Sequence, residues 1–310
     1  MADIRRALCA AVLACGLTGA GVAQAPDGPQ PAPVIAAIKA HPALWVVHSK
    51  TAAAWLFGSI HLLPPNIDWH SAAIDSAMAA SDIFVFEAPL DDAGQQETQA
   101  FVQAHGMLPP DVALPSLLDA QASKDYRAAL ASSHVPPSTL VHLRPWLAAI
   151  VLATGSMQNA HYSPAAGVDR QIYTLAIGQR KQVDTFETVD QQLALLMPKD
   201  TRLEVEEFDA SLKELTTGMG QVGELVDAWS EGRTDDVARQ LNAGLADTPG
   251  AMKLLIYDRN ARWAERMAAM LATHHTYFVT VGAGHLAGPR GLPALLAARG
   301  YRVERTPPNP

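Results

Sequence analysis

The chain has 310 residues, of which 49% are hydrophobic and 17% charged, and its formal net charge is −8. A chain of this length can bury a large core, and its acidic balance argues against nucleic acids and anionic membrane surfaces as partners. Both cysteines, Cys9 and Cys15, lie within the first 25 residues, so the rest of the chain offers no disulfide and no thiolate ligand for a metal.

Residues 1–25 have the pattern of a secretory signal peptide. A basic start and an apolar run over residues 7–14 are followed by Ala-Gln-Ala at residues 23–25, which resembles a signal-peptidase site. A lipoprotein anchored through Cys15 is disfavoured, because residues 12–15 match a lipobox poorly. After residue 25 the sequence contains no run of about 18 apolar residues, so no transmembrane helix is predicted in the mature chain. We therefore predict a periplasmic or secreted protein.

The folded domain is predicted over residues 42–306, after a Pro-rich leader at residues 26–41. It begins with an apolar β-hairpin over residues 44–57, which is followed by a helix over 68–80 and a strand over 83–86. A strand, a helix and a further strand in this order are typical of a crossover in an α/β sheet.

Two long segments rich in Ala and Leu, at about residues 91–160 and 189–272, are predicted to be helical insertions. A helix over residues 167–178 and a strand over 181–186 lie between them. A strand, a helix and a last strand follow over residues 277–305. Together these elements predict an α/β fold with a central mixed β-sheet, flanking helices and a helical cap.

The same short phrase, Gly-x-x-His-Leu, follows a predicted strand near each end of the chain. The first copy begins at Gly58 and carries His61, and the second begins at Gly282 and carries His285, 224 residues later. A glycine lets the backbone turn sharply, and loops at strand ends often carry catalytic groups in α/β proteins. A single histidine at a strand end is more often structural, but the repetition predicts that both histidines meet at one edge of the sheet.

Three carboxylates lie at or next to the ends of other predicted elements. Glu87 and Glu187 each follow a predicted strand, and Asp169 lies in the first turn of a predicted helix. The helix dipole explains Asp169 as well as a site role does, and Glu187 is explained equally well by hydrogen bonds to loop amides. Both alternatives stay open at this point.

Arg259, Asn260 and Ser59 are further candidates. Arg259 and Asn260 lie on one predicted helix, where the structural alternative is an ion-paired arginine and a cap. Ser59 is a weak candidate for a nucleophile, because the sequence around it lacks a Gly-x-Ser-x-Gly elbow. The glutamates in residues 204–207 are expected to form a solvated helix face rather than a metal cluster.

Several short pieces of the chain occur in the order seen in one known family. They are Phe57-Gly58-Ser59-Ile60-His61-Leu62, Phe86-Glu87, Gly167-Val168-Asp169, Phe186-Glu187-Thr188 with Gln191, Arg259-Asn260-x-x-Trp263-Ala264 and Val281-Gly282-Ala283-Gly284-His285-Leu286-x-Gly288. Through these pieces the chain resembles the TraB/GumN (TraB/PrgY/GumN) family over about residues 42–306. Animal Tiki proteins resemble the same family and are regarded as proteases active with manganese or cobalt. Erythromycin esterases and a haem-binding lipoprotein are more remote relatives, so the resemblance implies a Tiki/erythromycin-esterase-like fold.

The resemblance implies one cleft lined by the two histidine motifs and an acidic residue. Imidazoles and carboxylates are suitable ligands for Mn, Co or Zn, and the chain has no His-Glu-x-x-His helix of an ordinary zincin. We therefore predict a divalent metal held by His61, Glu87 and His285, with Glu87 as ligand or general base. Arg259 would polarise the scissile carbonyl of a peptide or hold the substrate. The residues expected to contact the substrate are Ser59, Asn260, Asp169 and Glu187.

Two other functions remain open for the same cleft. In a metal-free, esterase-like hydrolase, His61 or His285 would act as general base, Glu87 would orient it, and Arg259 would stabilise an oxyanion. In a non-catalytic protein the cleft would hold a peptide, a metal or haem without turnover.

Overall fold

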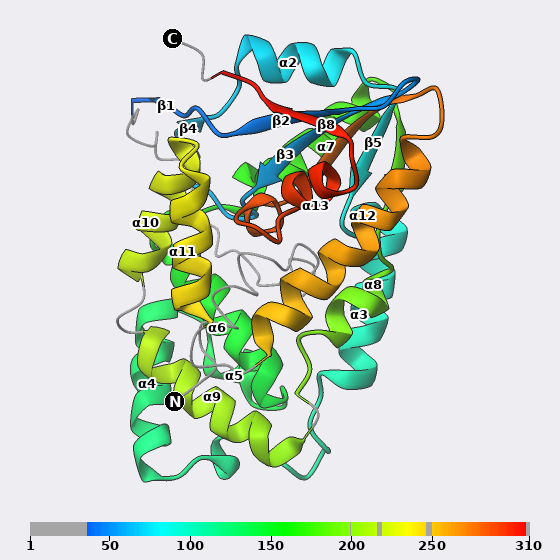
Figure 1. Ribbon diagram of the computed structural model, residues 1–310. Helices are drawn as coiled ribbons and strands as arrows, with labels where there is room; N and C mark the ends of the chain where they lie inside the picture. Colours follow the sequence, from blue (N-terminus) through cyan, green and yellow to red (C-terminus); the bar gives the residue numbers. More distant parts are fainter. Residues whose placement is uncertain (1–35, 199, 216–218, 246–249, 308–310) are drawn as a thin grey trace.

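The computed structural model describes residues 36–198, 200–215, 219–245 and 250–307 (Figure 1). The predicted signal peptide and most of the Pro-rich leader lie outside these residues. Near the end of the predicted leader, the two residues of strand β1 (Ile38–Lys39) pair in parallel with strand β4 (Ile67–Asp68). The last part of the predicted leader, residues 38–39, therefore forms a strand pair with the domain.

The main sheet contains six strands. They are β2 (Leu44–His48), β3 (Ala53–Ser59), β5 (Ile83–Phe86), β6 (Gln182–Thr185), β7 (Thr276–Gly282) and β8 (Arg302–Arg305). Their spatial order is β6-β5-β7-β3-β2-β8, and β2 runs antiparallel to the other five strands. The predicted mixed α/β sheet is confirmed, with the hairpin β2–β3 as expected.

The helices surround this sheet on both faces and at one end. In chain order they are α2 (Ala72–Ala79), α3 (Asp92–His105), α4 (Ala120–Ser133), α5 (Pro137–Leu140), α6 (Pro145–Asn159), α7 (Val168–Gly178), α8 (Val189–Ala194), α9 (Thr201–Leu215), α10 (Met219–Ser230), α11 (Thr234–Gly244), α12 (Asp258–Met270) and α13 (Leu292–Ala298). Shorter helical turns are η2 (Leu114–Leu117), η3 (Pro164–Ala166), the π-helix η4 (Lys253–Tyr257) and η5 (Ala283–Leu286). No helix in the described part of the chain is long and apolar enough to cross a membrane.

The central strands are buried on both faces, which explains their unbroken apolar sequences. On one face Phe57, Phe84 and Phe278 pack together in the larger core cluster, which also includes residues of α2 and α7. On the other face Leu56 and Val279 pack in a second cluster with residues of α12 and α13. Alternate residues of one strand therefore face different helical layers, as the period of a β-strand requires.

The two predicted helical insertions supply most of the helices below the sheet in Figure 1, where α4, α5, α6 and α9 form the far end of the molecule. Strand β3 runs toward these helices (Figure 1), and β7 is parallel to it. Chain segments that leave the carboxyl ends of these strands therefore enter the space between the sheet and the helical cap.

Glu204 corrects the prediction of a solvated acidic face on α9. Its side chain is fully buried and forms an ion pair of 2.7 Å with Arg144. Its second oxygen accepts a hydrogen bond of 3.3 Å from the backbone N–H of Trp146, in the first turn of α6. A carboxylate satisfies free N–H groups at a helix N-terminus, so Glu204 joins α9 to α6.

The helix predicted over residues 68–80 begins later than expected. Ile67 and Asp68 belong to β4, and α2 begins at Ala72 with the Ser71 hydroxyl accepting a hydrogen bond from the Ile74 N–H. Ser71 is a favourable N-cap residue, and the tertiary pairing of β4 with β1 takes the two earlier positions.

Candidate functional site

The three predicted metal ligands leave neighbouring strands at the same edge of the sheet. His61 follows β3, Glu87 follows β5 and His285 lies in η5 directly after β7. The β3–β7 register pairs Ser59 with Gly282, so the two histidine motifs begin within one residue of the same level of the sheet. All three side chains are at most 6% exposed.

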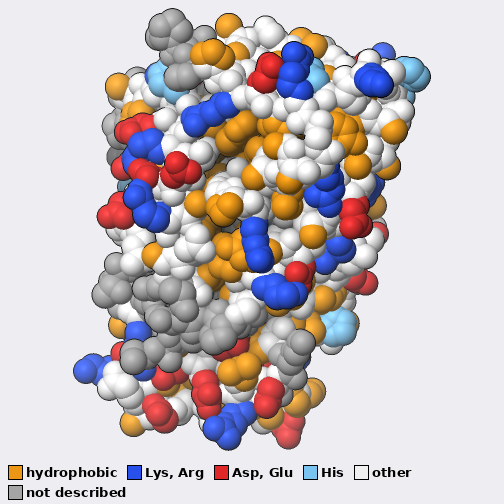
Figure 2. Space-filling model, viewed as in Figure 1, with side chains coloured by type: hydrophobic (Ala, Val, Ile, Leu, Met, Phe, Trp, Pro, Cys, Tyr) orange, Lys and Arg blue, Asp and Glu red, His pale blue; other side chains and the backbone are white. Residues whose placement is uncertain are grey.

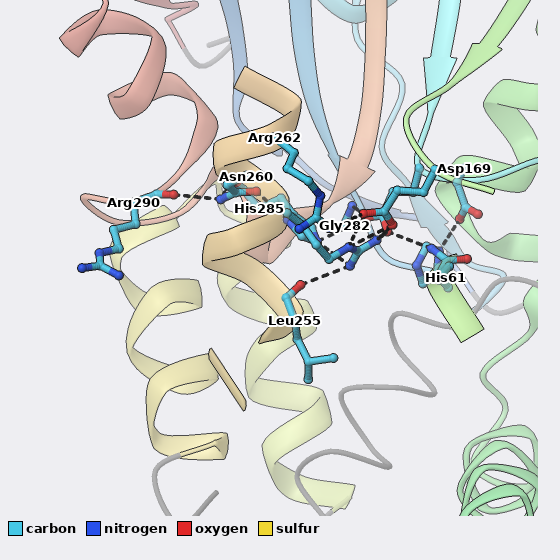
Figure 3. Close-up of polar contacts among 12 residues, drawn as sticks. His61, Asp169, Leu255, Asn260, Arg262, Gly282, His285 and Arg290 are labelled. Atoms are coloured by element: carbon cyan, nitrogen blue, oxygen red, sulfur yellow. Dashed lines mark hydrogen bonds and ion pairs between the residues drawn. The ribbon is translucent and has the colours of Figure 1, made fainter. Parts of the chain in front are cut away.

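Figure 3 shows one polar network in this region, with His285 and Asn260 on one side, Gly282 near the centre, and His61 and Asp169 on the other side. The network lies beneath the protein surface, because none of these side chains is exposed. The face viewed in Figure 2 carries hydrophobic side chains at its centre, with lysines and arginines beside them.

Gly58 and Gly167 allow the backbone to pack closely around the two histidine motifs. A Cβ atom on Gly58 would lie 3.0 Å from the Cα atom of Ala283, so only glycine lets η5 approach β3 at this distance. A Cβ atom on Gly167 would overlap the carbonyl group of His61. Gly167 therefore brings the N-terminus of α7, and with it Asp169, against the His61 segment.

Arg259 is the centre of the network and is itself 2% exposed. Its guanidinium group forms a bidentate pair with Glu187, with distances of 2.8–3.1 Å. Its Nη2 atom also lies 2.6 Å from Glu87 Oε2, and its Nη1 atom lies 3.1 Å from His285 Nε2. Burial alone would lower the pKa of Arg259, but the charges of Glu87 and Glu187 raise it, so the guanidinium stays charged.

The π-helix η4 contributes a backbone acceptor to the same group. The Leu255 carbonyl, within η4, accepts a hydrogen bond of 3.2 Å from Arg259 Nη1. The ring of Trp263 lies 4.6 Å from the guanidinium carbon. A short π-helix is often found at functional sites, and here it leads directly into the helix that carries Arg259.

Glu87 accepts hydrogen bonds from three donors. The Gly282 N–H donates to Oε1 at 2.6 Å, and Arg259 and Gln192 Nε2 donate to Oε2 at 2.6 and 3.0 Å. Burial alone would raise the pKa of this carboxyl group, but Arg259, the two histidines and the Gly282 N–H together outweigh it and lower the pKa to about 2. Glu87 is therefore ionised at neutral pH.

His285 is held by two groups with fixed hydrogen-bonding roles. Its Nδ1 atom lies 2.6 Å from Asn260 Oδ1, which can only accept, and its Nε2 atom faces the Arg259 guanidinium, which can only donate. The proton therefore lies on Nδ1 and the lone pair on Nε2. Burial, with Arg259 adding to its effect, lowers the pKa of His285 to about 3, so the ring is neutral at neutral pH.

His61 is held by a charged partner instead. Its Nδ1 atom lies 2.9 Å from Asp169 Oδ1, and both side chains are almost completely buried. A carboxylate at Nδ1 orients the imidazole ring and fixes its tautomer. The two copies of the motif thus place their histidines in different environments, one beside a carboxylate and the other beside an amide.

Glu187 and Asn260 belong to the network, whereas Ser59 is not joined to it. Glu187 and Glu87 lie side by side, because the Glu187 N–H donates to the Glu87 carbonyl at 2.8 Å. The Ser59 hydroxyl is buried and has no hydrogen-bond partner within the described residues. It therefore has no adjacent base that would activate it as a nucleophile.

Gln192 and Arg262 also contact the network, at Glu87 and Glu187, and neither was predicted from the sequence. Gln191, which carries part of the family resemblance, forms the capping box of α8 with Thr188. That cap fixes the start of the helix, and the next residue, Gln192, donates a hydrogen bond to Glu87. The capping-box pattern in the sequence predicts the start of the helix, but no local pattern identifies the partner of Gln192.

Comparison with known proteins identifies one family. The model of the TraB/PrgY/gumN family matches residues 43–305. The chain belongs to this family. No solved structure matches the chain.

Two curated relatives match a short part of this TraB-family chain. Metalloprotease TIKI2 of Danio rerio is 43% identical over 57 residues, which are 18% of this chain and 11% of that protein. Metalloprotease TIKI1 of Danio rerio is 44% identical over 55 residues, which are 17% of this chain and 11% of that protein. The match thus covers about a tenth of either relative, and the protease activity named for them is a hypothesis for this chain.

Proposed function

We propose that this TraB-family protein is a divalent-metal-dependent hydrolase that cleaves peptides. The observation that carries the proposal is the buried cluster of an ionised Glu87, a neutral His285 and a carboxylate-bound His61 at one edge of the sheet. The names of the Danio rerio relatives support the metal and the peptide substrate.

The donor atoms fit a divalent cation in type and in charge. The Nε2 atom of His285 and Oε1 of Glu87 are 3.7 Å apart, and a single ion with bonds of about 2.0–2.2 Å can reach both. Two buried carboxyl groups, those of Glu87 and Glu187, share the buried guanidinium of Arg259, and a third, that of Asp169, pairs with His61. Within the described residues no three potential ligands lie close enough together to hold a metal ion. Arg259 contacts both His285 and Glu87, so in this proposal it moves away from these two side chains when the ion binds.

In this proposal His61, Glu87 and His285 hold the ion, which would be Mn, Co or Zn. The bound metal would act as a Lewis acid and lower the pKa of a water molecule. The low pKa of Glu87 favours the role of ligand over that of general base, because so weak a base accepts protons poorly at neutral pH. Arg259 would donate hydrogen bonds to the scissile carbonyl.

The residues predicted to contact the substrate take different places in this proposal. Asn260, Asp169 and Glu187 hold His285, His61 and Arg259, so we assign them the positioning of those three side chains. Ser59 remains the candidate for contact with the substrate, because its buried hydroxyl lies at the end of β3, where the first motif begins.

A metal-free hydrolase is the second candidate, and the pairing of His61 with Asp169 favours it. A histidine oriented by a buried carboxylate at Nδ1 is the usual general base of esterase-like sites. His285 is unsuited to this role, since its low pKa makes it a weak base and Arg259 occupies its Nε2 atom. In this candidate Arg259 would stabilise the oxyanion.

Metal analysis of the purified protein, followed by a peptide-library cleavage assay, tests the proposal. The protein is treated with a chelator and then assayed alone and with Mn²⁺, Co²⁺ or Zn²⁺, beside His61→Ala and His285→Ala. We expect cleavage that depends on added metal and is lost in both variants. Cleavage that is indifferent to the chelator would support the metal-free candidate, and binding without cleavage would support a peptide-, metal- or haem-binding protein.

The proposal places the hydrolase in the periplasm or outside the cell, on the sequence pattern of residues 1–25. Mass spectrometry of the exported protein should find a new N-terminus at Gln24 or Pro26. Intact Met1 in the exported fraction would contradict the predicted cleavage.

A further inference from the structure

The proposed metal ligands already contact a cation that belongs to the chain. Arg259 Nη1 lies 3.1 Å from His285 Nε2, and Arg259 Nη2 lies 2.6 Å from Glu87 Oε2. His285 Nε2 is the ring nitrogen that carries the lone pair, and Glu87 is the neighbouring carboxylate. The guanidinium therefore engages the two groups that a metal ion would use.

The guanidinium also has partners that are not proposed ligands. Its Nε and Nη2 atoms contact both oxygens of Glu187, and Nη1 donates to the Leu255 carbonyl. A small rotation away from His285 and Glu87 would leave the Glu187 pair in place. The bidentate pair with Glu187 balances most of the charge of the guanidinium. Arg259 can therefore lose its contacts with His285 and Glu87 without becoming an isolated buried ion.

We infer that Arg259 competes with the divalent cation for His285 and Glu87, and that this competition sets the metal affinity of the site. The inference rests on the proposed metal dependence. Two like charges repel strongly in a buried site, so the guanidinium and the ion cannot both occupy the position between these side chains. Binding of the ion displaces Nη1 from His285 and Nη2 from Glu87 while the pair with Glu187 stays in place, so that these donors become available to a substrate carbonyl.

This competition predicts an unusual result for Arg259→Gln. Loss of an arginine from a site normally weakens binding, but here the variant should bind Zn²⁺ and Mn²⁺ at least tenfold more tightly than the wild type. Glu187→Gln should have the opposite effect, because Arg259 then loses its alternative partner and stays on Glu87. Arg262→Gln is the matched control, since Arg262 also contacts Glu187, at 3.4 Å, but touches neither proposed ligand.

The dissociation constants are measured by competition with a fluorescent chelator, using the full chain without substrate. Tighter binding by Arg259→Gln, weaker binding by Glu187→Gln and an unchanged Arg262→Gln support the inference. If the wild type binds metal and Arg259→Gln binds it more weakly, the competition is wrong while the metal site stands. If neither protein binds metal, the proposed function and the inference both fail.

A second measurement avoids the risk that the variants fold poorly. In wild-type protein labelled with ¹⁵N-arginine, the Nε–H signal of Arg259 is identified by its absence from Arg259→Lys. Saturating Zn²⁺ should shift this signal, because the guanidinium changes partners. An unchanged signal at full occupancy would overturn the inference.

Discussion

The Oδ1 atom of Asn260 lies 2.6 Å from Nδ1 of His285. The amide nitrogen of Asn260 donates to the backbone carbonyls of His285 and Arg290 at 3.1 and 2.8 Å, so the orientation of the amide is fixed. Asn260 and His285 are both fully buried. A neutral residue thus determines which nitrogen of His285 carries the lone pair, whereas a carboxylate holds His61.

Asn260→Asp should raise the pKa of His285 well above 3, because a carboxylate at Nδ1 stabilises the imidazolium form. NMR titration of the labelled histidine ring in chelator measures this change. Asn260→Ala should lower the free energy of unfolding by roughly 2–4 kcal/mol, since it leaves buried partners unsatisfied. Asn242→Ala, which removes an exposed hydrogen bond to Ala238, is the control and should change stability little. An unchanged pKa in Asn260→Asp would show that Asn260 does not control His285.

Gly167→Ala should destabilise the protein and disturb the contact between His61 and Asp169. The added methyl group would overlap the His61 carbonyl, so the start of α7 must move away from β3. We expect a loss of roughly 1–3 kcal/mol, as for other overpacked positions, measured by denaturant unfolding. Gly178→Ala, at the other end of α7, is the matched control because its added methyl group would meet no atom within 4 Å. Equal stability of the two variants would contradict the proposed close approach.

Stability of the metal-free protein should fall as the pH decreases below about 6.5. The pKa of His285 is about 3 in the folded state and 6.5 in the unfolded chain, so only the unfolded state binds this proton between those values. The free energy of unfolding should therefore decrease with falling pH, with a slope of up to roughly 1.4 kcal/mol per pH unit from this group. The slope is measured between pH 6.5 and 5, because the stabilising effect of Glu87 is lost only at lower pH, between about 4.5 and 2.

Urea unfolding in chelator at several pH values measures this slope for the wild type and His285→Gln. The variant should show a shallower dependence, because it lacks the group that takes up the proton on unfolding. His134→Ala, at an exposed position with a left-handed backbone, serves as the control and should keep the wild-type slope. Identical slopes in the wild type and His285→Gln would contradict the low pKa.

Glu204→Gln should destabilise the helical cap by roughly 1–3 kcal/mol. The substitution removes the charge that pairs with Arg144 and weakens the hydrogen bond to the Trp146 N–H at the start of α6. Thermal unfolding measures the loss. Glu206→Gln on the same helix is the matched control, because its ion pair with Arg202 is solvent-exposed and should contribute little. Equal effects of the two substitutions would argue against the structural role of Glu204.

Much of the fold could be predicted from the sequence, because apolar runs of β-rich residues form strands wherever they are buried. The order of those strands could not be predicted, since β7 lies between β3 and β5 although more than half of the chain separates it from either strand. Glu204 shows a related limit. A row of glutamates is usually solvated, and only the tertiary contact with Arg144 explains the burial of one member.

The candidate site was predicted in its residue types but not in its contacts. The repeated motif correctly brought His61 and His285 to one sheet edge, because neighbouring parallel strands place equivalent turns together. The sequence does not reveal that Asn260 faces Nδ1 of His285, or that Gln192 reaches Glu87. Such contacts depend on side-chain directions that a spacing pattern does not contain.

The parallel pairing of β3 with β7 also determines when the network can form during synthesis. The ribosome delivers His61 and Glu87 early, but Arg259 and His285 emerge only after most of the chain has been made. An incomplete chain therefore lacks the cation and the second imidazole, and leaves the carboxylate of Glu87 without either. The polar network around Arg259 consequently cannot be complete until β7 has paired with β3, late in the synthesis of the chain.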